Sequence, residues 1–141
     1  MHVDHVAVAV RSVDAAAERL TGLLGYSRRT EKITNHRQKV TVLFLAKAGS
    51  IDIKLIEPAG DDSPLWATLK KGEGLHHICF KVEDVKAACD DLADRGARIL
   101  APPEPGEAFD DNLIAFLYLG VGLNVELIDT DDRRGKLDPS S

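Results

Sequence analysis

The chain has 141 residues and a net charge of −5, with 44% hydrophobic and 29% charged residues, an ordinary composition for a globular protein. The acidic balance argues against general nucleic-acid binding, and no apolar run approaches the roughly 20 residues that span a bilayer. Because the N-terminus lacks a basic segment followed by an apolar one, we expect a cytoplasmic protein in which Cys79 and Cys89 are reduced thiols.

The first half of the chain reads as strands around one amphipathic helix. Valine-rich alternation from Val3 to Val10 indicates a strand. Ser12 is suited to cap a helix whose apolar residues recur at helical spacing, and Gly25 is suited to end it. We therefore expect a strand at 3–10, a helix at 13–24, a short strand at 26–33, a polar loop at 34–39, and a hairpin of strands at 40–46 and 51–57.

The second half repeats this order after a turn-rich connector at 58–74 that contains an amphipathic segment. Asp84 takes the capping position, and Gly96 ends the helix. We expect strands at 75–82, 97–101, 112–119 and 123–129, a loop with three prolines at 102–111, and a frayed polar tail at 130–141.

A constant offset of 72 residues, the separation of His5 and His77, relates the two halves over nearly the whole chain. Such a self-match indicates two copies of one structural unit. We expect an α+β fold in which paired βαβββ modules, about residues 3–57 and 75–129, form a cupped mixed sheet around a cleft. The helices would cover the outside, within a single domain of residues 1–141.

The same offset pairs Lys54 with Glu126. Side chains alternate between the faces of a strand, so His5 and His77 lie opposite the valine-rich core face and are expected to line the cleft. Two imidazoles and a carboxylate suit Zn²⁺, Co²⁺, Mn²⁺ or Fe²⁺. Each residue alone is more often structural, but their joint placement predicts a divalent metal ion bound by His5, His77 and Glu126.

Two polar features lie outside this set. His76 competes with His77 as a ligand, but it aligns with Asp4, so the repeat favours His77. A group of basic side chains could contact an anionic ligand, with a solvated loop as the alternative. It comprises Arg28, Arg29, Lys32, His36, Arg37 and Lys39.

Several stretches carry a family resemblance: Val3-Asp-His-Val-Ala-Val-Ala-Val10, Gly72-Glu-Gly-Leu-His-His-Ile-Cys-Phe-Lys-Val82 and Asn124-Val-Glu-Leu-Ile128. The chain resembles the vicinal oxygen chelate superfamily over about residues 3–130, and within it the methylmalonyl-CoA epimerases. The resemblance implies a homodimer and a metal-dependent epimerase or isomerase of an acyl-CoA such as methylmalonyl-CoA, with α-proton abstraction through an enolate. For such a reaction the sequence offers Glu126, and then Lys54, as the catalytic groups near the cleft.

Lys54 departs from the resemblance, because that metal position is normally Glu or Gln. An ammonium group beside a divalent cation is repulsive, which leaves three interpretations. The lysine is neutral and acts as ligand or base, or it turns away from the site, or its charge replaces the metal. The stretch Gly106–Asn112 also departs, because the epimerases carry a glycine-rich loop there.

Two other functions stay open. With one ligand fewer, His5, His77 and Glu126 match the two-histidine-one-carboxylate triad of an Fe(II) dioxygenase or lyase. With the charge of Lys54 in place of a metal, the chain would be a metal-free ligand-binding or resistance-type module.

Overall fold

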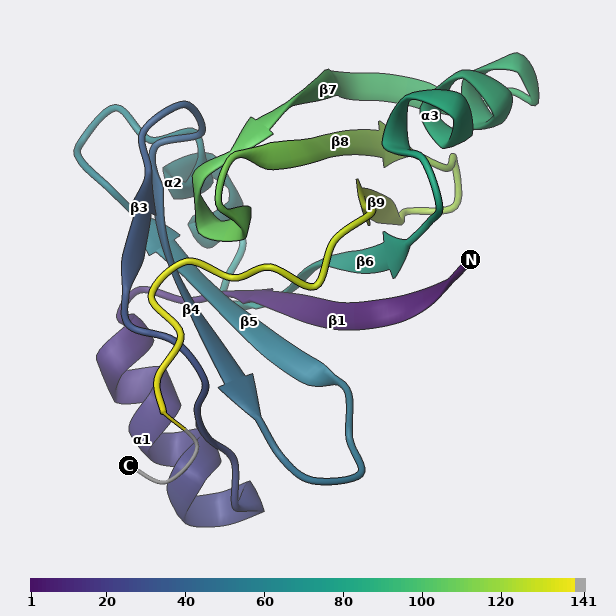
Figure 1. Ribbon diagram of the computed structural model, residues 1–141. Helices are drawn as coiled ribbons and strands as arrows, with labels where there is room; N and C mark the ends of the chain where they lie inside the picture. Colours follow the sequence, from purple (N-terminus) through teal and green to yellow (C-terminus); the bar gives the residue numbers. More distant parts are fainter. Residues whose placement is uncertain (139–141) are drawn as a thin grey trace.

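A computed structural model describes residues 1–138, in which strands and helices follow the predicted order with few changes (Figure 1). None of the helices in this part of the chain is long and apolar enough to cross a membrane. The elements are β1 (His2–Ala9), α1 (Val13–Leu24), β2 (Ser27–Arg28), β3 (Ile33–Asn35), β4 (Val40–Ala46), β5 (Asp52–Pro58), α2 (Leu65–Leu69), β6 (Gly74–Lys81), α3 (Val85–Asp94), β7 (Arg98–Gly106), a 3₁₀ turn (Glu107–Phe109), β8 (Asn112–Tyr118) and β9 (Asn124–Ile128).

One mixed sheet of nine strands runs through residues 1–138 in the order β2-β4-β5-β1-β6-β9-β8-β7, with β3 paired to β4. The halves meet where β1 runs antiparallel to β6. In each half the first strand pairs in parallel with the last, β1 with β5 and β6 with β9. The register follows the repeat, because Ala7 lies opposite Lys54 and Cys79 lies opposite Glu126. The predicted α+β fold is confirmed.

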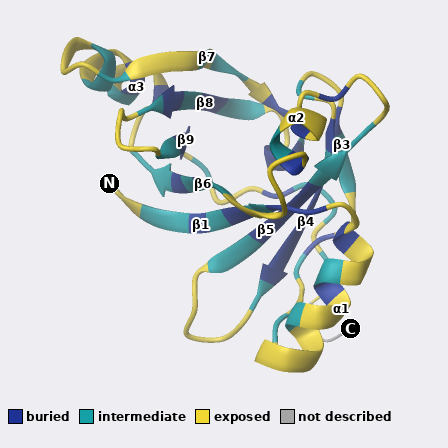
Figure 2. Ribbon diagram, turned by 180° about the vertical axis from the view of Figure 1, so that it is seen from behind, coloured by how far each residue is buried: buried dark blue, intermediate teal, exposed yellow. Residues whose placement is uncertain are grey.

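Helices α1 and α3 cover the outer face of the sheet, one in each half, as predicted (Figure 2). Ser12 begins α1 by accepting a hydrogen bond from the backbone N–H of Ala15 at 3.1 Å, and Asp84 begins α3 in the same way with Ala87 at 3.0 Å. Beneath the helices lie two apolar clusters of matching composition. They contain Val10, Val13, Ala17, Leu43, Leu45 and Leu55 in the first half, and Val85, Cys89, Ala115, Leu117, Val125 and Leu127 in the second.

Two regions expected to be irregular contain strand. The single strand expected at 26–33 is two short ones, β2 and β3, and β3 extends into the expected loop at 34–39. Strand β7 continues to Gly106, through the three prolines of the loop expected at 102–111. Proline lacks the N–H that a central strand needs, but β7 lies at the edge of the sheet and pairs only with β8, where proline is tolerated.

The predicted frayed tail is wrong for residues 130–138, which pack across the molecule from β9 to the region of β2 (Figure 1). The backbone N–H of Arg134 bonds the carbonyl of Ala108 at 2.9 Å, and that of Leu137 bonds the carbonyl of Arg29 at 2.9 Å. The segment lacks the apolar periodicity of a helix or strand. It is held instead by long-range backbone bonds and by the buried side chain of Arg133. Positions 139–141 of the predicted tail lie outside the described residues.

Candidate active site

The structure brings together the four residues that the repeat singles out, with the Glu126 carboxylate at their centre. His5 Nε2 lies 3.1 Å and His77 Nε2 lies 3.2 Å from Glu126 Oε1. Lys54 Nζ donates to both carboxylate oxygens, at 3.4 and 3.5 Å. All four side chains are buried, and Glu126 is 0% exposed. Lys54 therefore does not turn away from the site, which removes one of the three interpretations of this residue.

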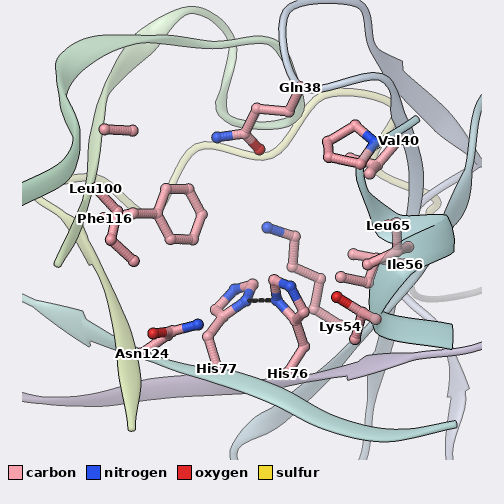
Figure 3. Close-up of a pocket in the computed structure, with 13 residues that line it drawn as sticks. Gln38, Val40, Lys54, Ile56, Leu65, His76, His77, Leu100, Phe116 and Asn124 are labelled. Atoms are coloured by element: carbon pink, nitrogen blue, oxygen red, sulfur yellow. Dashed lines mark hydrogen bonds between the residues drawn. The ribbon is translucent and has the colours of Figure 1, made fainter. Parts of the chain in front are cut away.

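A cavity of about 430 Å³ opens beside this cluster (Figure 3). Of the four residues, Lys54 and His77 line the cavity, whereas His5 and Glu126 lie behind them. A ligand in the cavity would thus meet the Lys54 ammonium group before it met the Glu126 carboxylate. The remaining lining is mostly apolar and consists of Gln38, Val40, Ile56, Pro64, Leu65, Thr68, His76, Leu100, Ala101, Phe116 and Asn124.

His76 reaches the cavity because of a β-bulge. In the pairing of β1 with β6, Ala7 lies opposite His77 but Val8 lies opposite Leu75, so His76 has no partner on β1. Strict alternation would turn His76 away from the side that His77 faces, and a bulge re-aims the extra side chain. Both imidazoles therefore point upward beneath the Lys54 amine, and their Nδ1 atoms are 2.7 Å apart (Figure 3).

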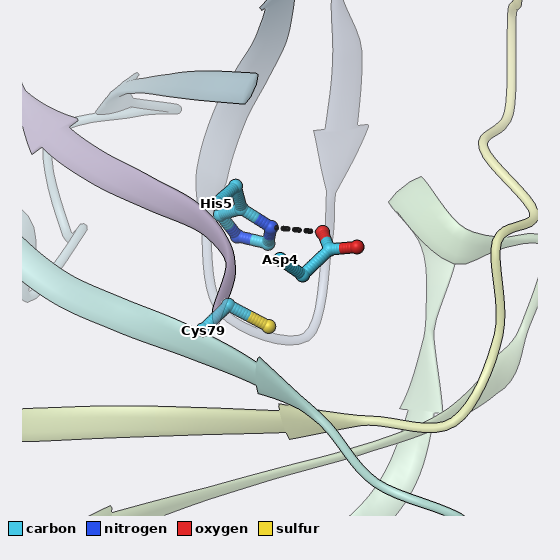
Figure 4. A group of neighbouring side chains, drawn as sticks. All are labelled: Asp4, His5 and Cys79. Carbon is cyan, nitrogen blue, oxygen red and sulfur yellow. Dashed lines mark hydrogen bonds and ion pairs between the residues drawn. The ribbon is translucent and has the colours of Figure 1, made fainter. Parts of the chain in front are cut away.

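A second bulge places Asp4 beside His5. Val3 lies opposite Phe80 and His5 lies opposite Cys79, which leaves Asp4 unpaired. Its Oδ2 accepts a hydrogen bond from His5 Nδ1 at 2.7 Å (Figure 4). Burial alone would raise the pKa of Asp4, but the hydrogen bond from His5 and the nearby Arg133 guanidinium hold it below its usual value.

Arg133, from the segment that was predicted to be frayed, completes this side of the site. Its Nη2 donates to Asp4 Oδ2 at 2.5 Å, and its guanidinium lies 4.7 Å from the ring centres of Phe44 and Phe109. The contact chain from Arg133 through Asp4 fixes the orientation of the His5 ring. Sequence reasoning missed this residue, because no local pattern marks an arginine that is buried by distant strands.

The electrostatics fix the hydrogen positions on the cavity side. Burial would raise the pKa of Glu126, but Lys54 and the two histidine hydrogen bonds lower it well below its usual range, so it is a carboxylate. Burial lowers the pKa of His77 to about 4 and also lowers that of His76. Neutral His77 must donate through Nε2 to Glu126 and accept at Nδ1 from His76. This leaves Nε2 of His76 as a basic nitrogen on the cavity.

The predicted divalent metal would lie among His5, His77 and Glu126. One ligand atom each from His5, His77 and Glu126 lie within 4.8 Å of one another, a donor set that metals accept. However, Lys54 Nζ contacts the same carboxylate. Two unit charges about 4 Å apart interact by roughly 4 kcal/mol at an effective dielectric constant of about 20, and a divalent ion doubles the repulsion. The donors therefore do not fit a divalent ion while Lys54 is protonated.

A neighbouring group formed by Asp4, His5 and Cys79 also has ligand atoms close together (Figure 4). Burial, reinforced by Glu126, raises the pKa of Cys79 well above its usual value, so this group is a thiol. Metals take the thiolate form of cysteine. Cys79 and Cys89 are both free, in agreement with the predicted reduced state.

The basic side chains considered as an anion site are each paired with a carboxylate and are spread over two regions. Arg28 and Lys32 both pair with Asp14, and Arg29 pairs with Asp52. At the other end of β4, His36, Arg37 and Lys39 pair with Glu107, Glu104 and Asp62. Only the second region flanks the cavity, because Gln38 lies in its lining.

Comparison with known proteins agrees with this architecture. Residues 4–116 match the family model of the glyoxalase/bleomycin resistance protein/dioxygenase superfamily. The chain is 36% identical over 118 residues to the ethylmalonyl-CoA/methylmalonyl-CoA epimerase of Cereibacter sphaeroides, covering 82% of this chain and 87% of that protein.

Two solved structures are similar to the whole sheet. A variant of Streptomyces coelicolor methylmalonyl-CoA epimerase in complex with 2-nitronate-propionyl-CoA has a TM-score of 0.80 at 30% identity, covering 93% of this chain and 98% of that one. A methylmalonyl-CoA epimerase in complex with methylmalonyl-CoA and NH4+ has a TM-score of 0.79 at 29% identity, covering 97% and 98%. The chain therefore belongs to the glyoxalase/bleomycin resistance protein/dioxygenase superfamily and shares its fold with methylmalonyl-CoA epimerases.

Proposed function

We propose that this chain epimerises a branched acyl-CoA, such as methylmalonyl-CoA or ethylmalonyl-CoA, by moving the proton on the carbon next to the thioester. The observation that carries this proposal is the convergence of the Lys54 ammonium group and the basic Nε2 of His76 on one largely apolar cavity. Support comes from the similarity to an ethylmalonyl-CoA/methylmalonyl-CoA epimerase and to an epimerase solved with an acyl-CoA analogue.

The proposed reaction needs a base, a group that stabilises an oxyanion, and a proton donor. His76 Nε2 removes the α-proton, and the electrons of the C–H bond form the carbon–carbon double bond of an enolate. The thioester oxygen receives the carbonyl electron pair and accepts a hydrogen bond from Lys54 Nζ, which opposes the developing charge. Lys54 then returns a proton to the opposite face of the carbon, and proton exchange with solvent through His76 restores both groups.

The sequence suggested Glu126 as the first candidate for the catalytic base, but this proposal gives it a different role. Its carboxylate is 0% exposed, accepts from three side chains and is absent from the cavity lining. A carboxylate held in this way, with its pKa far below the usual range, is a weak base. We assign to Glu126 the positioning of the Lys54 ammonium group and of the His77 ring, and through His77 that of His76.

An ammonium ion is present in the structure of one relative. One solved methylmalonyl-CoA epimerase is a complex with methylmalonyl-CoA and NH4+. In this chain the side chain of Lys54 supplies an ammonium group, and Asn124 and Gln38 add amide groups on either side of the cavity (Figure 3). We propose that these amides bind the carboxylate of the acyl group, while the apolar lining holds its branch.

The cavity is in the size range for one small ligand, so the acyl group and part of the pantetheine arm would fill it. The nucleotide would lie outside, where Arg37 and Lys39 flank Gln38. Their ion pairs with Glu104 and Asp62 are solvent-exposed. Exposed pairs of this kind contribute little stability, so phosphate groups can compete for the two side chains.

Incubation of the protein with one epimer of methylmalonyl-CoA in D₂O tests the proposed function. We expect deuterium in the α-position and the appearance of the second epimer, followed by NMR and mass spectrometry. Absence of exchange above background, with ethylmalonyl-CoA as well, would rule out the epimerase. If the acyl-CoA binds without exchange, the chain is instead the metal-free binding module.

Two expectations remain predictions, the homodimer from the resemblance and the cytoplasmic location from the N-terminal sequence. Homodimer formation is checked by light scattering on the purified protein. Cytoplasmic location is checked by fractionation of cells that express it.

A further inference from the structure

Lys54 and Glu126 occupy equivalent positions in the two halves of the repeat and lie together at the centre of the molecule. The two side chains carry opposite charges. They are separated by 72 residues, and they occupy the same register on β5 and β9, opposite Ala7 and Cys79. Each half therefore delivers one charged side chain from its last strand to a common point. A cation from one half meets an anion from the other, inside a buried cluster at the edge of the cavity.

The surroundings of Lys54 Nζ favour an ammonium ion in particular. The nitrogen lies 5.4 Å from the ring centre of Phe109 and 5.9 Å from that of Phe44. Aromatic faces attract a cation through their electron density, and they offer no ligand atom to a metal. Together with Glu126, the two phenylalanine rings form a binding site for an organic cation and not the coordination sphere of a metal.

His5 supports the same conclusion from the other side of the carboxylate. Its Nδ1 lies 2.7 Å from Asp4 Oδ2, and its Nε2 lies 3.1 Å from Glu126 Oε1. Both nitrogens face carboxylate oxygens, so both are placed to donate hydrogen. A metal ion would require a free electron pair on Nε2, whereas here Nε2 faces Glu126 Oε1 as a hydrogen donor.

We propose that Lys54 is the resident cation of this site, that its ammonium group takes the place of a divalent metal among His5, His77 and Glu126, and that one substitution at position 54 converts the cluster into a metal site. The catalytic consequence rests on the proposed function: the enolate oxygen is stabilised by an N–H donor of the protein, and activity needs no added ion. The metal-binding consequence is independent of any substrate.

Equilibrium dialysis with Co²⁺, read together with its visible absorption spectrum, tests the metal-binding half. We expect weak Co²⁺ binding by the wild-type chain. Lys54→Glu and Lys54→Gln should bind about one ion per chain, roughly 100-fold more tightly, because the repulsion is removed and an oxygen ligand is added. Lys54→Met is the matched control, since it removes the charge at similar length and supplies no oxygen. It should bind Co²⁺ less tightly than Lys54→Glu.

The ligands are checked by adding His5→Ala to the Lys54→Glu variant, which should abolish the tight binding. Without metal, Lys54→Glu places two carboxylates together and should unfold at a lower temperature. Co²⁺ should raise that temperature in proportion to ln[Co²⁺] once the site is saturated, by mass action. If Lys54→Glu does not fold, the neutral Lys54→Gln variant gives the same comparison without the second carboxylate.

Either of two metal-binding results would overturn the proposal: a wild-type chain that carries about one divalent ion after purification without added metal, or no gain in Co²⁺ affinity in Lys54→Glu and Lys54→Gln. Deuterium exchange by the wild-type protein after dialysis against EDTA should be unchanged. Loss of exchange on EDTA treatment, restored by a metal, would likewise overturn it. No exchange under any condition would reject the proposed function and leave the Co²⁺ result valid.

Discussion

Asp4 and His76 occupy equivalent positions in the two halves, and each lies in a β-bulge where it hydrogen-bonds Nδ1 of the histidine that follows it in the chain. The equivalence ends with their surroundings. Asp4 is closed off by Arg133, whereas His76 borders the cavity. Each half thus contains a polar residue that orients one of the two central histidines. Of these two residues, His76 is the one that can contact a ligand in the cavity.

Replacement of His76 should separate catalysis from folding. We expect His76→Asn to lower kcat for α-deuterium exchange by roughly 10²–10⁴-fold, the usual contribution of a general base. The asparagine amide can still donate to His77 Nδ1, so the cluster should keep its hydrogen bonds. His36→Asn is the control, because His36 is 80% exposed and does not line the cavity. An unchanged kcat in His76→Asn would return the role of base to Glu126.

Adjacent arginines in the C-terminal segment give a matched test of its packing. Arg133→Met should lower the free energy of unfolding by roughly 2–3 kcal/mol, somewhat less than the loss expected for a fully buried pair, because Asp4 is 13% exposed. Arg134→Met removes exposed pairs with Asp110 and Asp111 and should cost less than about 1 kcal/mol. Urea unfolding measures both. Equal losses would show that residue 133 does not anchor the segment.

The strand positions of the central residues could be predicted from the sequence, but the β-bulges that orient the neighbouring side chains could not. A repeat of constant length carries strand positions from one half to the other, which is why Lys54 and Glu126 meet. A bulge, in contrast, adds one residue without changing the apolar pattern. Alternation alone therefore placed His76 on the wrong side of its strand. The only available signal was its alignment with Asp4, which pairs two polar residues next to the two histidines.

The C-terminal segment was mispredicted for another reason. Residues 130–138 have no apolar periodicity, and their contacts include backbone bonds to Ala108, Arg29 and Glu31 as well as side-chain pairs such as that of Arg133 with Asp4. Such contacts depend on where distant strands lie. A sequence pattern cannot report them, because periodicity records only which face of an element is apolar.

Gly106 ends β7 where no side chain fits. A Cβ atom there would lie 2.9 Å from Ile114 Cγ2, so Gly106→Ala should lower the free energy of unfolding by roughly 1–3 kcal/mol through overpacking. Gly22→Ala is the control. It lies in α1 with nothing within 4 Å of the added atom, and alanine favours the helix by up to about 1 kcal/mol. The two substitutions should therefore shift the urea midpoint in opposite directions.

The two thiols should be unreactive in the folded chain. Cys79 is 0% and Cys89 is 1% exposed, and burial raises the pKa of both. The thiolate is the reactive form, so a raised pKa lowers its population at pH 8. We expect a thiol reagent such as Ellman's to label neither cysteine of the native protein within minutes and both after denaturation. Fast labelling of Cys79 in the native protein would contradict the burial of β6, and fast labelling of Cys89 would contradict the packing of α3.

The rim of the cavity gives the prediction that bears most directly on the substrate. Arg37→Ala combined with Lys39→Ala should raise KM for an acyl-CoA by roughly tenfold, equivalent to about 1.4 kcal/mol, and should leave kcat unchanged. The corresponding acyl-pantetheine lacks the nucleotide phosphates, so its KM should not change. The control pair Arg28→Ala with Lys32→Ala removes the same charge at the other end of β4, near α1. If both pairs raise KM equally, the effect is that of net charge, and the nucleotide does not lie at this rim.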